Sequence, residues 1–177
     1  MLGVRRAGDR FWEEVKIIDG PHTRAIIQRA KDEDKPGDQF LAPKLSIRVK
    51  PDSLVTSGQV LLLKSGDHYL VGDHNATTEW RTHHLFKCDR QVTWLRPATT
   101  TDALTGLPKS STNTTMGHPW VYWERVARNQ YDNQTKFDLI TYLVACGGDV
   151  QLNDTLDGHQ VFRFDRSLGL NILGLRQ

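Results

Sequence analysis

Six residues near the middle of the chain carry side chains that metal ions accept as ligands. They are Asp67, His68, Asp73, His74, His83 and His84. Carboxylates and imidazoles bind divalent transition metals. Adjacent residues on a strand point to opposite faces of a sheet, so neither of the two contiguous pairs can converge without a bend. We therefore interpret these residues as polar strand ends in solvent, and we expect no metal or other cofactor.

The sequence has no motif for a known type of catalysis. It contains no GxSxG elbow, phosphate-binding loop, Rossmann glycine fingerprint, HExxH pair or EF-hand. No serine stands in a recognisable nucleophile context. Cys88 and Cys146 lie far apart without metal-binding spacing, and we interpret both as reduced thiols. The sequence predicts a protein that is not an enzyme.

Composition places the chain among globular proteins with an ordinary core. Its 177 residues are 38% hydrophobic and 25% charged, which allows a buried core without disulfides. The formal charge of +2 is too small to indicate nucleic-acid binding, so any basic surface must be local. No apolar run approaches the roughly 20 residues that span a bilayer, and the first residues lack an apolar leader segment. We expect neither membrane insertion nor secretion by this route.

A short stretch of alternating residues predicts a strand with one buried face and one basic face. Its apolar positions are Leu45, Ile47 and Val49. If these side chains enter a core, then Lys44, Arg48 and Lys50 follow one another along the opposite face. Such a row would attract a phosphate backbone without reading its sequence. A solvated edge strand that lysine and arginine protect from aggregation is the alternative.

Turn residues separate this strand from several others in the first half of the chain. The expected strands cover residues 11–18, 23–28, 45–50, 60–63, 68–71, 83–88 and 91–95. Residues 11–18 would also suit a helix, but the Asp-Gly-Pro turn after them favours a hairpin. Antiparallel strands so close in sequence curl and close readily. The predicted fold is mainly β, with a small antiparallel barrel of the SH3-like or OB-like kind over residues 1–97.

Two polar segments divide the rest of the chain. Residues 29–39 are almost wholly charged and predict an exposed loop. Residues 98–117 are rich in Thr, Ser, Gly and Pro, and predict a linker or a long loop. Residues 118–177 then form a mixed, β-rich C-terminal extension, for which a second small β unit is one interpretation.

Two ambiguities remain in the second half of the chain. Residues 137–144 fit a strand or a helix equally well. The order turn, strand, glycine turn, strand at residues 57–69 recurs at residues 147–161. This echo indicates either an internal duplication or the common chemistry of antiparallel sheets.

The order LSIRV, SGQVLLL, SGDHYLVGD and THHLFKC resembles the lambda-type head–tail joining proteins of tailed bacteriophages, which belong with the head-completion and stopper proteins. The match covers about residues 40–90, and its motifs are patterns of a small barrel. The resemblance implies a structural protein of the virion neck without catalytic residues. It also implies a ring of about six or twelve copies below the portal. That ring would contact portal or adaptor and tail proteins, and would hold packaged double-stranded DNA without sequence specificity.

Under this resemblance, the sequence offers candidates for two kinds of contact. The row Lys44, Arg48 and Lys50 is the candidate surface toward DNA. The candidate subunit contacts are Lys31, Asp32, Glu33, Asp34, Lys35, Trp120 and Trp123. Packing of the tryptophans in a core is the alternative to an interface role.

A stand-alone barrel that binds nucleic acid is the alternative function. It would be a monomer whose affinity for nucleic acid falls steeply with salt. Few aromatic residues occur in the predicted barrel strands, and Tyr69 is the main candidate for stacking on a base.

Overall fold

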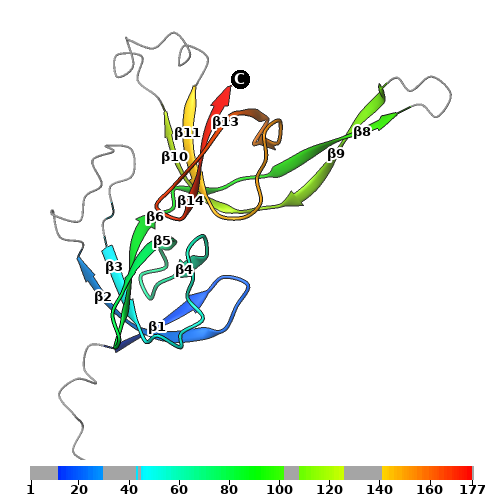
Figure 1. The fold of residues 1–177 in the computed structure, drawn as a ribbon. Helices are drawn as coiled ribbons and strands as arrows, with labels where there is room; N and C mark the ends of the chain where they lie inside the picture. The colour runs from blue at the N-terminus through cyan, green and yellow to red at the C-terminus, as the bar shows by residue number, and fades with distance from the viewer. Residues whose placement is uncertain (1–11, 30–42, 44, 102–107, 126–140, 177) are drawn as a thin grey trace, which may run out of the picture. The chain divides into compact units, whose positions relative to one another are not determined.

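The computed structural model describes residues 12–29, 43, 45–101, 108–125 and 141–176. In these residues it contains strands and turns, and none of them forms a helix long and apolar enough to cross a membrane (Figure 1). The strands are β1 (Trp12–Ile17), β2 (His22–Arg29), β3 (Leu45–Val49), β4 (Val60–Leu62), β5 (His68–Ala76), β6 (Arg81–Lys87), β7 (Arg90–Gln91), β8 (Trp94–Thr101), β9 (Pro108–Gly117), β10 (Trp120–Arg125), β11 (Tyr142–Cys146), β12 (Thr155–Leu156), β13 (His159–Ser167) and β14 (Leu170–Arg176). The predicted mainly-β class is confirmed.

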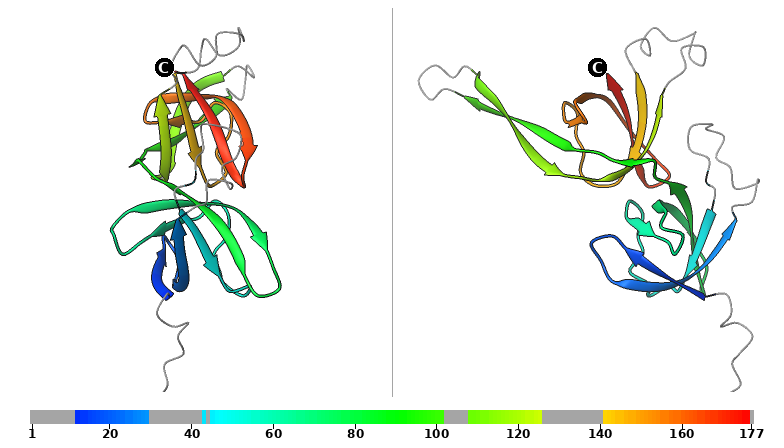
Figure 2. Two further views of the ribbon diagram at one scale, coloured as in Figure 1. Left: turned by 90° about the vertical axis from the view of Figure 1, so that its left-hand side faces the viewer. Right: turned by 180° about the vertical axis from the view of Figure 1, so that it is seen from behind.

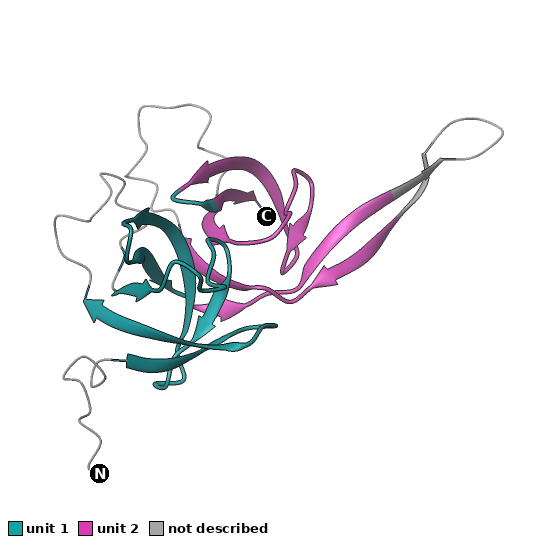
Figure 3. Ribbon diagram, turned by 60° about the horizontal axis from the view of Figure 1, so that its bottom comes forward, with its two compact units in different colours: residues 1–88, 168–170 teal, residues 89–167, 171–177 magenta. Residues whose placement is uncertain are grey.

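The chain divides into two compact units, which Figure 3 shows in different colours. Unit 1 consists of residues 1–88 and 168–170, and unit 2 consists of residues 89–167 and 171–177. Each unit has a hydrophobic core of its own.

Unit 1 is a closed antiparallel barrel with the strand order β1-β2-β3-β6-β5-β4. Strand β1 closes it by pairing with two neighbours. It pairs with β2 from Trp12 to Lys16, and Lys16 and Ile17 also pair with β4. The predicted small antiparallel barrel is thus confirmed, including the hairpin of β1 and β2.

The core of unit 1 follows the two-residue period of its strands. On β3, Ile47 and Val49 are fully buried, and Leu45 packs partly buried against the same cluster. Arg48 lies between them and is exposed, as is Lys50 just after the strand. Each fully buried aliphatic side chain contributes about 1.5–3 kcal/mol through removal of its surface from water. The predicted buried face of this strand is therefore confirmed.

Unit 2 is a curled sheet with the order β7-β10-β11-β14-β13-β12-β8-β9 (Figures 1 and 2). Strands β7 and β8 follow each other along one segment of chain, from Arg90 onward. Strand β7 pairs with β10, whereas β8 pairs with β12 at the other side of the sheet. This one segment therefore joins both sides of the curled sheet.

The two units repeat one topology. The order β10-β11-β14-β13-β12 in unit 2 corresponds to β2-β3-β6-β5-β4 in unit 1. The segment of residues 90–95 takes the place of β1, because it pairs with the counterparts of both β2 and β4. The echo in the sequence agrees with this only in part: the glycine turns at Gly66 and Gly158 both precede equivalent strands, β5 and β13, but residues 150–152, expected as the counterpart of β4, lie in a turn region before β12. The shared strand order supports the duplication interpretation.

Residues 98–117 differ from the predicted linker or long loop. Strands β8 and β9 pair with each other from Leu95 and Thr115 out to Thr101 and Pro108. The composition indicated a loop because these residues have little to bury. Backbone pairing needs no burial, however, and β-branched threonine suits a strand. We call the two-stranded part, residues 96–101 and 108–114, the arm.

The predicted boundary of the first domain also differs from the structure. Residues 89–97 were expected in the first barrel, but they belong to unit 2. The β-rich extension after residue 117 is present in the described part of that unit as strands β10 to β14. Of the ambiguous segment 137–144, Tyr142 begins strand β11, and residues 137–140 lie outside the described part.

Candidate functional site

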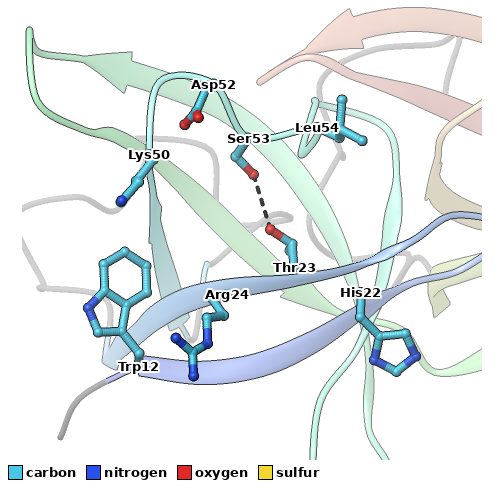
Figure 4. A pocket seen from close by; sticks show the side chains of 8 residues that line it. All are labelled: Trp12, His22, Thr23, Arg24, Lys50, Asp52, Ser53 and Leu54. Carbon is cyan, nitrogen blue, oxygen red and sulfur yellow. Dashed lines mark hydrogen bonds between the residues drawn. The ribbon is translucent and has the colours of Figure 1, made fainter. Parts of the chain in front are cut away.

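A cleft of about 550 Å³ opens on unit 1 beside strands β1 and β2 and the segment that follows β3 (Figure 4). Its lining residues are Trp12, His22, Thr23, Arg24, Lys50, Asp52, Ser53 and Leu54. They combine an indole ring, two permanent cations and several hydrogen-bonding groups.

The alternation of the strands brings the indole and the cations to one face. Val15 is fully buried on β1, so Trp12, three residues earlier, has the opposite orientation. Ala25 is fully buried on β2, and its neighbour Arg24 faces outward. Lys50 follows the buried end of β3 and is exposed in the same way. Three separate segments therefore contribute to one surface, which only the pairing of their strands assembles.

Hydrogen bonds hold the wall of the cleft in place. The Ser53 hydroxyl lies 3.5 Å from that of Thr23 and accepts a bond of 3.3 Å from the N–H of Val55. The Arg81 guanidinium donates to the carbonyl of Ser53. Because Val55 is fully buried, the segment after β3 is tied to the core on one side and to β2 on the other. The cleft is therefore a formed feature of the barrel.

The Trp12 ring has a second indole as its neighbour. Its centroid lies 5.5 Å from that of Trp80, with the planes tilted by 39°. Both indoles are partly exposed. Such a pair holds an aromatic ring at a surface where a flat ligand can stack on it.

Positive charge dominates the permanent charges around the cleft. Arg24, Lys50 and the nearby Arg48 are exposed, and none of them forms an ion pair with another described residue. Asp52 is the one carboxylate among the lining residues. Outside the lining, Glu14 lies opposite Arg24 and 3.2 Å from His22. Three cations with two opposing carboxylates favour an anionic partner, and this attraction weakens with salt.

The predicted site residues are only partly within the described structure. Arg48 and Lys50 lie on the outer face as the alternation required. Lys44 and the charged residues 31–35 lie outside the described part of the chain. Trp123 is 9% exposed and belongs to the core of unit 2, which favours the packing interpretation for it, while Trp120 is half-buried.

Sequence reasoning missed two members of the cleft and misjudged one residue. Arg24 and Trp12 were not singled out, although the buried Ala25 and Val15 beside them follow the same alternation that revealed Arg48. Tyr69 was the expected stacking residue, but it is 7% exposed and belongs to the core of unit 1. Trp12 is the aromatic residue that the cleft presents.

The six candidate metal ligands have other environments. Asp67 binds Lys87 at 2.8 Å, and hydrogen bonds from Lys87 and Ser65 lower the pKa of its carboxyl group. His83 is buried with its Nδ1 3.1 Å from the carbonyl oxygen of Gly72. In the part of the chain that the structure describes, no three His, Cys, Asp or Glu side chains are placed to hold a metal ion.

The arrangement is suited to binding an anion with a flat apolar part. Arg24 and Lys50 can neutralise phosphate groups, and the Trp12 ring offers a surface for stacking. Comparisons of the chain with protein-family models, with curated proteins and with solved structures give no match. Its function is therefore inferred from these residues and their geometry.

Proposed function

We propose that this protein is a structural component of a tailed-bacteriophage neck. Copies of it form a ring below the portal, retain the packaged DNA and connect the head to the tail. The observation that carries the proposal is a closed barrel at the residues that resemble head–tail joining proteins, with Arg24, Arg48 and Lys50 exposed on its outer face. These cations supply the contact to DNA.

The contact to DNA is electrostatic and reads no sequence. Each cation that neutralises a phosphate releases condensed counterions, so that affinity falls with about the 0.9th power of the salt concentration per contact. Three cations in one copy give a weak contact alone. A ring multiplies the contact by its number of copies, because the later contacts form within one assembly.

Neutralising the three cations tests the contact to DNA. In the triple variant Arg24→Gln, Arg48→Gln, Lys50→Gln, we expect affinity for double-stranded DNA to fall at least about tenfold. The logarithmic salt slope should fall by roughly 3 per copy. Fluorescence anisotropy of a labelled duplex at several salt concentrations measures both quantities.

A matched control removes the same charge elsewhere. Lys16, Lys64 and Arg166 are also exposed, and none of them lines the cleft. Their triple substitution by glutamine should weaken binding much less. Equal weakening by the two triple variants, or undiminished binding by the first, would contradict the proposed contact surface.

Assembly is tested separately from DNA binding. The molar mass of the purified protein, from light scattering, should correspond to a ring or should become that of a ring on addition of portal protein. Negative-stain microscopy should show the ring. A protein that stays monomeric with and without portal protein would rule out the neck assignment.

Stand-alone binding of single-stranded nucleic acid is a second candidate, which the Trp12 ring beside Arg24 and Lys50 favours. Base stacking on an aromatic side chain contributes about 1–3 kcal/mol. In that case Trp12→Leu should weaken binding of single strands roughly tenfold or more, and the protein should act as a monomer. Under the neck assignment, Trp12→Leu leaves the affinity for duplex DNA nearly unchanged.

A further inference from the structure

The arm of unit 2 has two backbone edges without a neighbouring strand among the described residues. Strand β9 is the last strand of its sheet. Strand β8 pairs with β12 only at Trp94 and Leu95. From Arg96 onward the arm is therefore a ribbon of two strands, which Figures 1 and 2 show running out from the rest of the unit.

Among the side chains of the arm that the structure describes, none belongs to either hydrophobic core. The side chains of residues 112–116 on β9 are all exposed, and the largest of them, Met116, is 41% exposed. An isolated two-stranded ribbon is at best marginally stable in water, and a third strand or a packed face stabilises it. The arm as it stands presents a surface that another strand can complete.

The root of the arm, in contrast, is fixed by a buried network. Arg96 donates two hydrogen bonds of 3.0 Å to the carboxylate of Asp154, which is 1% exposed. The indole N–H of Trp94 donates to the same carboxylate at 2.8 Å, and the N–H of Gln151 donates at 2.9 Å. A ribbon held this firmly where it leaves the sheet is positioned to make a contact.

The composition of the arm determines the kind of partner. The arm has two charged residues, Arg96 at its root, which is bound to Asp154, and Lys109 at the far end of β9; residues 97–101 and 110–114 contain no charged side chain. They offer no cation to a nucleic acid and no charge to an oppositely charged protein. Two copies can approach each other along these uncharged residues without repulsion. On β9 the proline and lysine that commonly prevent edges from pairing stand only at its first two positions, Pro108 and Lys109. A second copy of this chain is therefore the partner that fits.

We propose that two copies of the chain associate through their arms. The outer edge of β9 in one copy pairs with a free edge of the arm, on β8 or β9, in the other copy, so that the arms form one antiparallel sheet. Backbone hydrogen bonds supply the attraction in this mode, and the exposed side chains of Thr112 and Thr114 would lie next to those of the second copy. The inference rests on the proposed function in that copies assemble, and it identifies the segment that joins them.

The pairing within the arm shows which backbone groups point outward. Pro97 lies opposite Asn113. Proline has no N–H, so this pair cannot exchange two ladder hydrogen bonds. In an antiparallel pair of this kind the backbone groups point away from the partner strand. We therefore expect the N–H of Asn113 to face the free edge of β9.

Two substitutions at Asn113 separate the backbone from the side chain. Asn113→Pro removes the outward N–H and places a ring at the free edge, without removing a hydrogen bond between β8 and β9. Asn113→Ala keeps the N–H and removes only the side-chain amide. We expect Asn113→Pro to raise the dissociation constant between copies at least about tenfold, and Asn113→Ala to leave it nearly unchanged.

Light scattering over a dilution series of the full chain measures the association. Circular dichroism and the thermal transition verify that both variants fold. A lower molar mass of the assembly in Asn113→Pro, but not in Asn113→Ala, supports the arm contact. A mass unchanged by Asn113→Pro, an equal loss in Asn113→Ala, or a wild-type chain that is monomeric at all concentrations would overturn it. A wild-type dimer sensitive to Asn113→Pro would support the arm contact and contradict the ring.

Discussion

The two units have the same strand order, but they connect the first two strands of that order differently. In unit 1, β1 leads into β2 through a tight turn, in which Ile17 accepts a 3.0 Å hydrogen bond from the N–H of Gly20. In unit 2, the equivalent segment of residues 90–95 leads into the arm before the chain returns as β10. The insertion occupies a connection between strands, where added length costs little.

Unit 2 retains its closing contacts despite the insertion. The N–H of Thr93 donates to the Asp157 carboxylate at 2.7 Å, and the N–H of Asp157 donates to the Thr93 carbonyl at 3.0 Å. The N–H of Val92 donates to the carbonyl of Pro119 on the other side. The comparison teaches that one strand order accommodates a cleft in unit 1 and an arm in unit 2.

The cores of the two units also differ in chemistry. Aliphatic side chains dominate in unit 1, whereas unit 2 includes Trp123 and Cys146. Burial raises the pKa of the Cys146 thiol to about 12, which keeps it in the unreactive protonated form. Cys88 is also buried and free, in agreement with the expectation of reduced thiols.

The largest expected effect compares equivalent core leucines. Leu61 on β4 and Leu156 on β12 are both fully buried. We expect Leu61→Ala and Leu156→Ala each to lower the free energy of unfolding by about 2–5 kcal/mol, because each leaves a cavity. Denaturant unfolding followed by tryptophan fluorescence measures the change and shows whether one transition or two are affected.

Exposed leucines provide the controls for this pair. Leu54 in unit 1 is 63% exposed, and Leu152 in unit 2 is 56% exposed. Leu54→Ala and Leu152→Ala should change the free energy of unfolding by less than about 0.5 kcal/mol. If a core variant were no more costly than its control, the equivalence of β4 and β12 would be wrong.

The next effect concerns the buried carboxylate of unit 2, which has no described counterpart in unit 1. Asp154→Ala should lower the free energy of unfolding by about 2–3 kcal/mol. The loss is smaller than for a fully buried ion pair because Arg96 is partly exposed. Burial disfavours the charged Asp154 carboxylate, but hydrogen bonds from Arg96, Gln151 and Trp94 outweigh it and lower its pKa below 3.8.

The sign of the pH dependence follows from this lowered pKa. The stabilisation by Asp154 is complete above the unfolded-state value of 3.8 and is lost as the pH falls through the folded-state pKa. Urea unfolding of the wild type and of Asp154→Asn between pH 5 and pH 2 measures this loss of stability. An unchanged dependence in Asp154→Asn would show that other carboxylates cause the loss.

A smaller effect compares two turns. Gly66 precedes β5 and Gly158 precedes β13, with φ angles of 84° and 80°, and a Cβ at either would meet no atom within 4 Å. Gly66→Ala and Gly158→Ala should each lower the free energy of unfolding by about 1 kcal/mol, because the left-handed backbone conformation is the only feature that disfavours the added side chain. Thermal unfolding measures both. A cost much above this in one turn would indicate that the two turns differ in structure.

The smallest expected effect is a pH response of unit 1 alone. Burial lowers the pKa of His83, and the hydrogen bond to Gly72 opposes this only in part. Below the unfolded-state value of 6.5 the unfolded chain takes up a proton that the folded state does not, so stability decreases as the pH falls through this range. Unfolding at pH 7.5 and 5.5 should show the decrease in wild type and a smaller one in His83→Gln. An equal decrease in His83→Gln and in wild type would show that His83 is not the cause.

Much of unit 1 could be predicted because its signals are local. The alternation at Leu45, Ile47 and Val49 reports the buried face directly, since successive side chains on a strand point to opposite sides. The turn residues around Gly66 likewise fix the β4–β5 hairpin within a few residues of sequence. The arm was missed because its polar composition is equally typical of a loop, and only the pairing of β8 with β9 distinguishes the two.

The sequence by itself determined which residues form strands in the first barrel and which of their faces is apolar. Tertiary structure alone decided that residues 90–95 belong to unit 2, since their partners on β10 and β12 come much later in the chain. It also decided that Trp12, Arg24 and Lys50 line one cleft. The period of a strand acts over neighbouring residues, whereas the choice of partner strands depends on contacts between distant ones, and no local pattern encodes that choice.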